Sequence, residues 1–331
     1  MILTKTPYRI SFFGGGTDYP QWYLKNGGEV ISSTIDKYVY ISCRHLPSFF
    51  DHKYRIVYSR LEMVKNISSI KHLPIKVALK EIEKKIKKIP GLEIHYNGQL
   101  PARSGMGSSS SFVVGLLKTL DHYFGFQIDK KKLAEKSVFF EREKLKEIVG
   151  SQDQVAAAYG GFNSIKFDTN GTFKVTPIFS SKNDMISFSK NLFIYYTDIN
   201  RTAKYIAKTY VKKLNSEKKK NMFDILSHVK ESKKILKSKN YDDFGRLLNE
   251  TWKIKRNLSK QVSSSFIDKI YSNGIKQGAL GGKLLGAGGG GFVLFYVPKD
   301  NQKNFLKKMK SRLLFPVNFT SSGSEIVYTD E

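Results

Sequence analysis

The most informative segment of this chain reads Pro101-Ala102-Arg103-Ser104-Gly105-Met106-Gly107-Ser108-Ser109-Ser110-Ser111. Its two glycines allow a tight turn that brings backbone amides close to a ligand. Apolar residues recur with a helical period over residues 112–124, so a helix is expected to begin directly after the turn. The unpaired amides and positive dipole end of that helix would face whatever fills the turn. We interpret the segment as a polyphosphate cradle, although a capped helix with small packing residues explains it equally well when it is taken alone.

Two other glycine-rich segments favour the cradle. The first is an expected strand that ends in three glycines and then presents a carboxylate, a good acceptor for sugar hydroxyls, and it reads Thr6-Pro7-Tyr8-Arg9-Ile10-Ser11-Phe12-Phe13-Gly14-Gly15-Gly16-Thr17-Asp18-Tyr19. The second places four consecutive glycines before an apolar strand and reads Gly281-Gly282-Lys283-Leu284-Leu285-Gly286-Ala287-Gly288-Gly289-Gly290-Gly291-Phe292. Such a run of glycines costs considerable backbone entropy, which suggests that something must approach this backbone closely.

The chain has an unusually basic composition. Its 331 residues include 56 Lys and Arg, only 10 of them Arg, against 29 Asp and Glu, for a formal net charge of +27. The lysines are concentrated in expected helices, where we interpret them as solvated faces that also attract anionic small molecules. A dedicated nucleic-acid binder would gather its basic residues on one face, with arginine prominent. We therefore expect no nucleic-acid partner.

The single cysteine, Cys43, excludes a disulfide within the chain and a zinc site rich in thiolates. No stretch approaches the ~18 unbroken apolar residues that a membrane helix needs. Residues 1–16 lack the charged and then apolar pattern of a signal peptide. These features together predict a cytoplasmic enzyme without a membrane partner.

Strand-like and helical patterns alternate irregularly along the chain. Alternating or short apolar runs predict strands at residues 8–13, 38–43, 54–58, 92–96, 162–167, 192–196, 292–297 and near 326. Helical spacing predicts helices at residues 75–89, 112–124, 130–146 and 302–312, with several more between 203 and 277. Because there is no regular βα repeat, an α+β fold is favoured over a doubly wound sheet. A polar, turn-prone break at residues 180–184 predicts two domains, residues 1–180 and 181–331.

With these three segments in order, the chain resembles the GHMP kinase family, named for galactokinase, homoserine kinase, mevalonate kinase and phosphomevalonate kinase. The family has an N-terminal Pro-x-Arg…Asp motif, a central Pro-x-x-x-Gly-x-Gly-Ser-Ser motif and a C-terminal glycine-rich motif, and all three occur here. The resemblance implies a two-domain α+β fold with ATP as the phosphoryl donor. The N-terminal, ATP-binding domain would be like domain 2 of ribosomal protein S5, and the C-terminal domain would be ferredoxin-like.

Two shorter stretches, residues 12–19 and 151–161, look like the branch of the family that contains D-glycero-D-manno-heptose 7-phosphate kinases. That resemblance implies transfer of the ATP γ-phosphate to the anomeric hydroxyl, giving a 1,7-bisphosphate for GDP-heptose and bacterial surface polysaccharide. L-fucokinase domains share much of this sequence, so a fucokinase-like or other sugar 1-kinase is an alternative. A basic RNA-binding protein with an S5-like fold is a third reading, but it leaves Asp18, Glu141 and Asp153 unexplained.

The resemblance also carries catalytic roles onto this sequence. Asp153 matches the aspartate that acts as catalytic base in galactokinase-like members, and such assistance is typically worth ~10²–10⁴ in rate. Arg9 matches an arginine near the reacting groups, where it would neutralise charge on the transferred phosphoryl group. Glu141 stands near the position of the family's magnesium-binding glutamate, with Ser110 as the second ligand and Glu143 as a rival. One carboxylate and one hydroxyl are a plausible protein share of a Mg²⁺ site.

The remaining site residues follow the three motifs. ATP binding is implied for Pro101, Ser104, Gly105, Met106, Gly107, Ser108, Ser109, Ser110 and Ser111. Substrate binding is implied for Gly15, Gly16, Thr17, Asp18, Arg201, Gly288 and Gly289. A phosphate on the acceptor would need basic partners, for which the candidates are Arg44, Arg103, Arg201 and Lys283. The expected ligands are therefore a sugar phosphate, ATP and Mg²⁺, and a homo-oligomer is left open.

Overall fold

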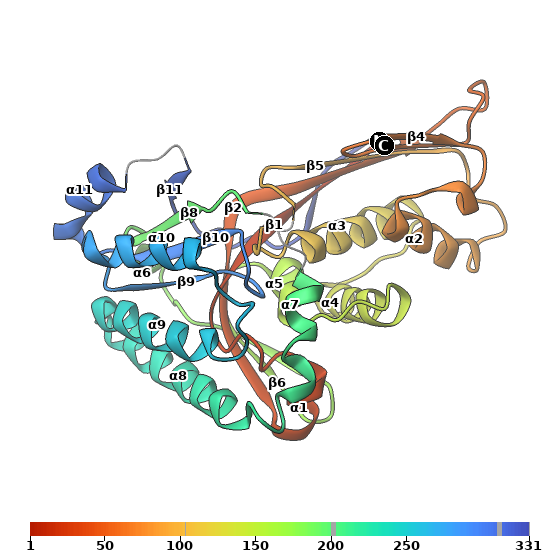
Figure 1. The fold of residues 1–331 in the computed structure, drawn as a ribbon. Helices are drawn as coiled ribbons and strands as arrows, with labels where there is room; N and C mark the ends of the chain where they lie inside the picture. Colours follow the sequence, from red (N-terminus) through yellow and green to blue (C-terminus); the bar gives the residue numbers. More distant parts are fainter. Residues whose placement is uncertain (103, 200–202, 310–312, 331) are drawn as a thin grey trace.

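Two β-sheets organise the structure, a computed structural model that describes residues 1–102, 104–199, 203–309 and 313–330. The larger sheet and its helices make up one half of the molecule, and the smaller sheet and its helices make up the other (Figure 1). Both halves mix helices and strands without a repeating βα unit. The predicted α+β class is therefore confirmed.

The larger sheet contains eight of the described strands. Its main order is β12-β1-β2-β5-β3-β4, and β6 pairs with both β2 and β7. The strands are β1 (Ile2–Phe13), β2 (Gly28–His45), β3 (Tyr54–Val57), β4 (Leu61–Val64), β5 (Leu92–Gly98), β6 (Phe162–Phe167), β7 (Phe173–Pro177) and β12 (Glu325–Thr329). Only β3 and β5 pair in parallel among these. The long strands β1 and β2 run through the middle of the molecule (Figure 1), and residues 14–27, which contain the glycine turn and α1, connect them.

Helix α3 packs on β1 and β2 through a face of small and hydroxyl-bearing residues. Ser111 Oγ donates to the carbonyl of Pro7 at 2.9 Å, Thr119 Oγ1 donates to Thr4 Oγ1 at 2.6 Å, and a Cβ on Gly115 would lie 2.8 Å from Thr6 Oγ1. Neighbouring helices α4 and α5 pack against α3 and against each other. The helices of this half are α1 (Pro20–Asn26), α2 (Leu73–Glu83), α3 (Ser108–Tyr123), α4 (Lys130–Phe139) and α5 (Gln152–Tyr159), with a 3₁₀ turn at Ile67–Ser69 and a π-helical turn at Phe140–Lys144.

The smaller sheet has the order β11-β8-β10-β9, and all its neighbours are antiparallel. Its strands are β8 (Leu192–Tyr196), β9 (Gly281–Leu284), β10 (Phe292–Tyr296) and β11 (Leu314–Pro316). Helices α8 and α9 lie side by side, and α9 packs on β9 (Figure 1). The helices of this half are α6 (Lys182–Ser189), α7 (Ala203–Lys208), α8 (Lys219–Ser238), α9 (Tyr241–Arg256), α10 (Ser265–Lys276) and α11 (Lys299–Lys308), with a 3₁₀ turn at Val211–Lys213.

An aromatic cluster joins the two halves. The ring of Phe188 on α6 lies 4.8 Å from Phe244 on α9, measured between ring centroids. The same ring lies 5.7 Å from Phe162 on β6 and 6.2 Å from Phe12 on β1. All four side chains are buried. Because these rings come from both halves, the hydrophobic core is continuous across the junction.

The chain ends beside its beginning. Strand β12 pairs with β1, and the amide of Asp330 donates to the carbonyl of Met1 at 2.9 Å, so both termini lie at the same edge of the larger sheet (Figure 1). Residues 325–329 therefore complete a sheet that is built mainly from residues 1–180. Near the expected boundary, α6 begins at Lys182. The division into residues 1–180 and 181–331 stays a prediction.

Most of the expected elements are present, and the differences are local. Strands β6 and β8 have the expected bounds, whereas the helix expected at 75–89 ends at Glu83 and is followed by a lysine-rich segment. The helix expected at 130–146 becomes α4 followed by the π-helical turn. For the helix expected at 302–312, α11 spans Lys299–Lys308, and residues 310–312 lie outside the described part.

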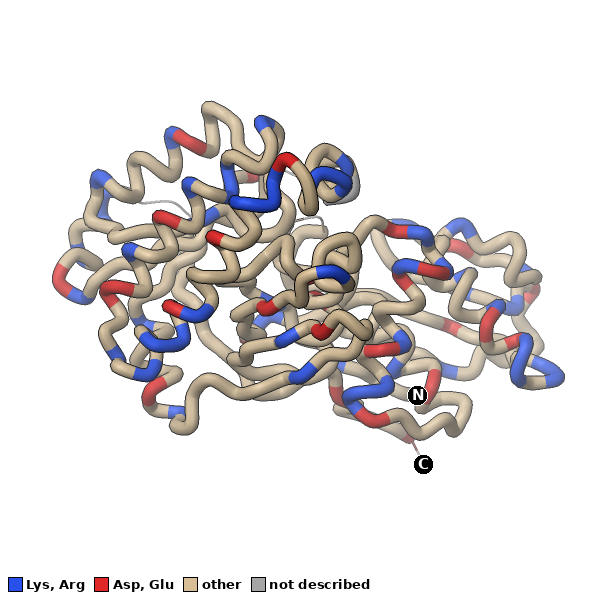
Figure 2. The backbone as a smooth tube through the Cα atoms, turned by 90° about the horizontal axis from the view of Figure 1, so that it is seen from below, with Lys and Arg blue, Asp and Glu red and all other residues tan. Residues whose placement is uncertain are grey.

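Charged residues are distributed over the whole molecule. Figure 2 shows Lys and Arg on the helices of both halves, interspersed with Asp and Glu rather than gathered on one half. This distribution is consistent with solvated helix faces. In the described part of the chain, no helix combines the length and the apolar character needed to cross a bilayer.

Candidate active site

A cavity of about 330 Å³ lies where the three glycine-rich segments meet. Residues from both halves of the molecule form its wall, which explains why no single segment of sequence defines it. The predicted site residues that line it are Arg9, Gly15, Gly16, Asp18, Gly105, Gly107, Ser108, Ser109, Ser110, Asp153 and Gly288. Eleven residues chosen from separate motifs are thus brought to one place.

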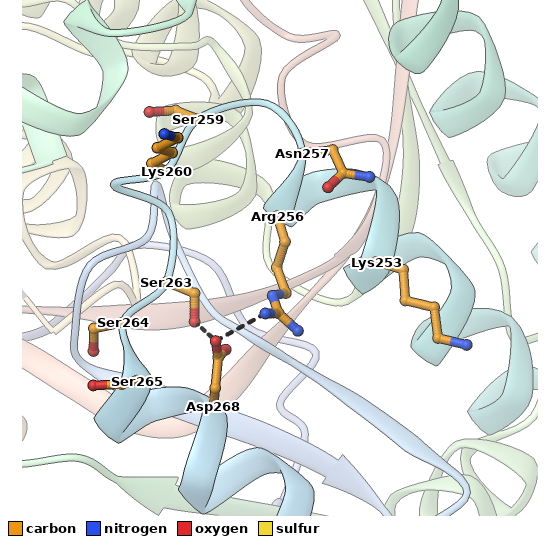
Figure 3. Close-up of a pocket in the computed structure, with 9 residues that line it drawn as sticks. All are labelled: Lys253, Arg256, Asn257, Ser259, Lys260, Ser263, Ser264, Ser265 and Asp268. Atoms are coloured by element: carbon orange, nitrogen blue, oxygen red, sulfur yellow. Dashed lines mark hydrogen bonds and ion pairs between the residues drawn. The ribbon is translucent and has the colours of Figure 1, made fainter.

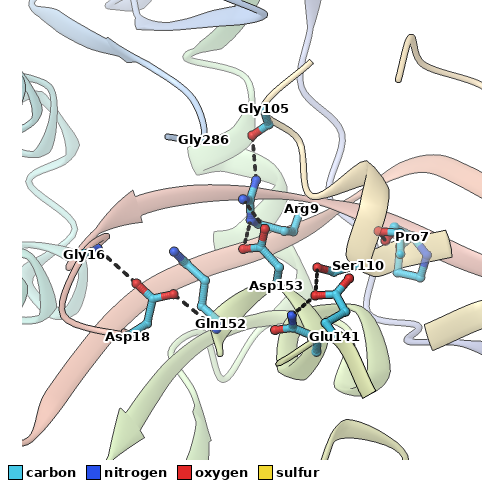
Figure 4. Close-up of polar contacts among 12 residues, drawn as sticks. Pro7, Arg9, Gly16, Asp18, Gly105, Ser110, Glu141, Gln152, Asp153 and Gly286 are labelled. Carbon is cyan, nitrogen blue, oxygen red and sulfur yellow. Dashed lines mark hydrogen bonds and ion pairs between the residues drawn. The ribbon is translucent and has the colours of Figure 1, made fainter. Parts of the chain in front are cut away.

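An ion pair between Arg9 on β1 and Asp153 in the first turn of α5 forms part of the cavity wall (Figure 4). The guanidinium donates from Nε to Oδ1 at 2.8 Å and from Nη2 to Oδ2 at 2.7 Å, and its Nη1 donates to the carbonyl of Gly105 at 2.8 Å. Such a two-point contact fixes the orientation of a carboxylate. The Arg9 side chain is 4% exposed and that of Asp153 is 26% exposed, so the carboxylate is the accessible partner.

Asp18 follows the glycine turn, and its carboxylate is buried against the start of α5 (Figure 4). Its Oδ1 accepts from the amide of Gly16 at 2.9 Å, and its Oδ2 accepts from the amide of Gln152 at 3.4 Å. Burial, and then the charge of Asp153, raise the pKa of Asp18. Gly150 makes this close packing possible, because a Cβ at that position would lie 1.8 Å from Oδ2. Asp18 is thereby held near Asp153.

The π-helical turn at Phe140–Lys144 brings Glu141 to the start of α3. A π-helical turn fits an extra residue into the helix and rotates the side chains that follow. Glu141 is buried and accepts hydrogen bonds from Ser110 Oγ at 2.9 Å and from Gln154 Nε2 (Figure 4). Burial raises the pKa of Glu141 to about 7. No described group donates to its second oxygen, Oε1.

The predicted turn leads directly into α3, but it ends at Gly107, and the serines at 108–111 form the first turn of the helix. Gly107 precedes the helix with a φ of 73°, and the helix begins at Ser108. Gly105 also has a positive φ, of 82°, and a Cβ there would lie 2.5 Å from the carbonyl oxygen of Leu285. The turn therefore packs directly on the C-terminal glycine-rich segment. The start of α3 then lies at the cavity, where Ser108, Ser109 and Ser110 line the wall, and a helix start suits an anion.

Two family models match this chain. The GHMP kinases N terminal domain model matches residues 72–161, and the GHMP kinases C terminal model matches residues 232–313. A D-glycero-alpha-D-manno-heptose 7-phosphate kinase from Campylobacter jejuni is 31% identical over 326 residues, which cover 96% of this chain and 96% of that protein. The chain belongs to the GHMP kinase family.

Two further comparisons agree with membership of the GHMP kinases. An L-fucokinase/L-fucose-1-P guanylyltransferase from Bacteroides fragilis is 28% identical over 91% of this chain and 35% of its own length. The crystal structure of a D-glycero-D-manno-heptose 1-phosphate kinase from Bacteroides thetaiotaomicron has the same fold, with a TM-score of 0.83, 22% identity and 100% coverage of both chains. The predicted two-domain GHMP kinase fold and the predicted enzyme class, an ATP-dependent sugar kinase, are confirmed.

Some predicted ATP-binding residues of this GHMP kinase support the turn without lining the cavity. Ser104, Met106 and Ser111 are buried, and the hydroxyl of Ser111 donates to the carbonyl of Pro7 at 2.9 Å. This hydroxyl and the carbonyl of Met106, which accepts from the amide of Arg9 at 3.1 Å, hold the turn against β1. Pro101 is exposed at the beginning of the turn.

Two predicted substrate-binding residues have backbone or hydroxyl contacts of their own. Thr17 is buried, and its hydroxyl donates to the carbonyl of Gly14 at 2.8 Å, so it closes the glycine turn. The amide of Gly289 donates to the carbonyl of Val262 at 2.9 Å. Both residues shape the loops that carry their neighbours into the cavity wall.

The candidates for an acceptor-phosphate clamp are not gathered in the cavity wall. Lys283 is buried, and its Nζ donates to a backbone carbonyl of β1 at 2.7 Å. Arg44 pairs with Glu93 at 2.7 Å in the larger sheet. Neither side chain lines the cavity. Arg103 and Arg201 lie outside the described residues.

Sequence reasoning missed Lys255 and Tyr210, which also line the cavity. A signal for Lys255 was present, because Leu248 and Trp252 occupy the same helix face, so this lysine stands at an apolar-face position. Tyr210 lies beside Tyr19, with ring centroids 6.5 Å apart, and burial raises its pKa to about 12. No pattern in the sequence indicates that contact.

A larger hollow of about 570 Å³ lies between the end of α9 and the start of α10 (Figure 3). Its polar wall includes Lys253, Arg256 and Asp268, and Arg256 pairs with Asp268 at 2.8 Å. Most of its side chains are exposed, and none of the three motifs contributes a residue. The smaller cavity is therefore the candidate active site.

Proposed function

We propose that this GHMP kinase transfers the γ-phosphoryl group of ATP to the anomeric hydroxyl of D-glycero-D-manno-heptose 7-phosphate and releases the 1,7-bisphosphate. The observation that carries the proposal is the ion pair of Arg9 and Asp153 in the wall of the cavity that also contains the start of α3. A carboxylate beside a phosphate-binding helix start suits phosphoryl transfer to a hydroxyl. The choice of acceptor is supported by the 31% identity to the Campylobacter jejuni kinase.

The donor side would consist of the turn before α3 and the first residues of that helix. Backbone amides and the hydroxyls of serines 108–110 would hold the ATP phosphates. Ser110 and Glu141 would hold Mg²⁺, and the unpartnered Oε1 of Glu141 fits a cation at that position. No set of three or more His, Cys, Asp or Glu ligands occurs among the described residues, so the nucleotide would complete the coordination. When bound, Mg²⁺ supplies charge neutralisation to the phosphates.

The acceptor side would be organised by Asp153. Its carboxylate would accept or orient the proton of the sugar hydroxyl while the oxygen bonds to phosphorus and the phosphorus–oxygen bond to ADP breaks. Arg9 holds this carboxylate by two hydrogen bonds and adds positive charge next to the transferred group. Asp18 would accept hydrogen bonds from other sugar hydroxyls.

An L-fucokinase-like activity on an unphosphorylated sugar is the second candidate. It is supported by the 28% identity to the Bacteroides fragilis protein over 91% of this chain. The positions of Arg44 and Lys283 also favour it. Both lie outside the cavity wall, so neither could bind the 7-phosphate of an acceptor in the cavity. If the acceptor is the heptose 7-phosphate, we infer that the enzyme is cytoplasmic and that its product is used to make GDP-heptose and surface polysaccharide.

Phosphorus NMR of the reaction products tests the proposed function. The protein is incubated with ATP, Mg²⁺ and D-glycero-D-manno-heptose 7-phosphate, with Asp153→Asn as the inactive control. We expect a new phosphorus signal coupled to the anomeric proton, together with loss of the ATP γ signal. If a new anomeric phosphate forms from L-fucose and none forms from the heptose phosphate, the second candidate replaces the first.

A further inference from the structure

Lys255 lines the cavity and is not among the residues that would hold ATP, Mg²⁺ or the acceptor. It is the last residue but one of α9 and lies on the buried face of that helix, after Thr251 and Trp252. It is 7% exposed, whereas its neighbour Lys253 on the same helix is exposed. The helix therefore carries one lysine into the cavity and another into solvent.

The ammonium group of Lys255 is bonded only to backbone carbonyls in the described structure. Its Nζ donates to the carbonyl of Gly286 and, at 3.4 Å, to that of Leu284. No described carboxylate lies within ion-pair distance of it. A buried ammonium without a carboxylate is costly, because carbonyl oxygens replace the lost hydration only in part. A ligand that brings negative charge would compensate such a group.

Lys255 and Arg9 hold the two glycines at which the phosphate turn meets the C-terminal glycine-rich segment. Arg9 donates to the carbonyl of Gly105 at 2.8 Å, and Lys255 donates to that of Gly286. These glycines are in direct contact, since a Cβ on Gly286 would lie 2.5 Å from the Cα of Gly105. The two cations are near enough for Arg9, after burial, to lower the pKa of Lys255, which falls to about 8.

The charge of Lys255 has no described partner in the cavity. Among the described wall residues, the cations are Arg9 and Lys255, and the carboxylates are Asp18, Glu147 and Asp153. Asp153 is paired with Arg9, whereas the ammonium of Lys255 donates to backbone carbonyls. An anion bound beside Lys255 would supply the missing partner. The anion that the proposed reaction supplies is the phosphoryl group of the nucleotide.

We propose that Lys255 is a second catalytic cation, which binds the phosphoryl group as it passes from ATP to the acceptor. This inference rests on the proposed kinase reaction but not on the identity of the sugar. The bond from phosphorus to the ADP oxygen breaks, the bond to the acceptor oxygen forms, and the acceptor proton goes to Asp153. Lys255 donates hydrogen bonds to the non-bridging phosphoryl oxygens and transfers no proton. A cation beside the transferred phosphoryl group stabilises the negative charge on its oxygens in the transition state.

Three variants test this role: Lys255→Met, Lys255→Arg and the matched control Lys253→Met. For each, kcat and KM are measured with ATP and heptose 7-phosphate, together with the Kd of ADP and the Tm. Removing Lys255 should lower kcat by ~10²–10³-fold, as expected for a lost transition-state contact. The Kd of ADP should stay within about twofold, because ADP lacks the transferred group. The Tm should not fall, because an apolar side chain replaces a poorly compensated buried charge.

The two other variants separate charge from packing. Lys255→Arg keeps the positive charge and should retain a kcat within about tenfold of the unmodified protein, since a guanidinium still binds phosphoryl oxygens. Lys253→Met should change no parameter by more than about twofold, because its side chain is exposed.

Several results would overturn the role of Lys255. One such result is a kcat of Lys255→Met within threefold of that of the unmodified protein. Another is a loss of ADP affinity together with a lower Tm, because it would mean that Lys255 only supports the glycine-rich segment. A raised KM for heptose 7-phosphate at unchanged kcat would assign Lys255 to the acceptor phosphate instead. If the unmodified protein phosphorylates a different sugar, the proposed acceptor is wrong, and the same variants compared on that sugar still decide the role of Lys255.

Discussion

Arg9 and Asp153 lie 144 positions apart in the chain and meet in a two-point ion pair, with Nε–Oδ1 and Nη2–Oδ2 distances of 2.8 and 2.7 Å. The pair connects β1 of the larger sheet to the first turn of α5. Because the guanidinium also holds the carbonyl of Gly105, one side chain positions both the carboxylate and the phosphate turn. Arg9 therefore fixes the position of the acceptor side of the cavity relative to the donor side.

Replacing Asp153 tests its role in proton transfer. Asp153→Asn keeps the size of the side chain but cannot accept a proton, so kcat should fall by ~10²–10⁴-fold. The Kd of ATP should change little, because the proposed role of this carboxylate is to accept the proton of the sugar hydroxyl. Steady-state kinetics and nucleotide titration measure the two effects. Asp168→Asn, which alters an exposed pair with Lys166, is the control and should remain active. Near-normal turnover of Asp153→Asn would remove this residue from catalysis.

Gly150→Ala tests whether the position of Asp18 matters for the acceptor. A Cβ at residue 150 would lie 1.8 Å from Asp18 Oδ2, so the carboxylate must move. We expect the KM for the acceptor to rise by about tenfold, in line with one lost hydrogen bond to a charged group. Gly125→Ala is the control, since its Cβ would meet nothing within 4 Å, although its φ of 75° makes that substitution strained as well. Equal acceptor KM values in the two variants would exclude a substrate contact by Asp18.

Glu141→Gln tests the proposed magnesium site. The amide can still accept hydrogen bonds but carries no negative charge, so the Mg²⁺ concentration for half-maximal activity should rise by about tenfold or more. Glu143→Gln is the control, because Glu143 is exposed and pairs with Lys146 at 3.3 Å. A larger effect of the Glu143 substitution would transfer the metal role to that residue.

The pH dependence of the magnesium requirement follows from the buried state of Glu141. Burial raises the pKa of Glu141 to about 7, so in the metal-free protein this carboxylate becomes increasingly protonated as the pH falls below 7. Mg²⁺ needs the ionised carboxylate, and its half-maximal concentration should therefore rise roughly fivefold from pH 7 to pH 6. Above pH 8 the requirement should be constant. Activity titrations with Mg²⁺ at several pH values measure this, and Glu141→Gln should lose the dependence. A requirement that falls with acidification would contradict the assignment.

Phe188→Ala tests the junction between the two halves. The side chain is fully buried among Phe12, Phe162 and Phe244, so its truncation should lower the free energy of unfolding by about 3–5 kcal/mol. Thermal and denaturant unfolding measure the change. Phe49→Ala is the control, since Phe49 is 80% exposed and its loss should change stability by less than about 0.5 kcal/mol. Similar stabilities of the two variants would mean that the halves do not share a core.

The local parts of the site could be predicted from the sequence, because turns and helix starts depend on neighbouring residues. The glycines at 105 and 107 and the apolar period after them were enough to predict a helix at residues 112–124, and α3 begins four residues earlier, at Ser108. The pairing of Arg9 with Asp153 could be inferred only through the family resemblance, since nothing in either segment indicates a partner 144 positions away.

Other features of the site depend on packing between distant segments, so the sequence contains only weak signals for them or no signal at all. The π-helical turn that directs Glu141 toward Ser110 interrupts a pattern that is typical of a continuous helix. Lys255 stands on the apolar face of α9, a signal that is readable only when each position of the helix is assigned to a face. Tyr210 immediately precedes the 3₁₀ turn at Val211–Lys213, and its contact with Tyr19 is purely tertiary.

The central claim is that a heptose 7-phosphate is the acceptor, and comparing acceptors tests it most directly. The value of kcat/KM is measured with D-glycero-D-manno-heptose 7-phosphate, with the unphosphorylated heptose and with L-fucose, at saturating ATP and Mg²⁺. We predict that the heptose 7-phosphate is preferred by about 10²-fold or more, because a site that binds a charged group discriminates strongly against acceptors that lack it. An equal or higher kcat/KM with either unphosphorylated sugar would contradict the claim.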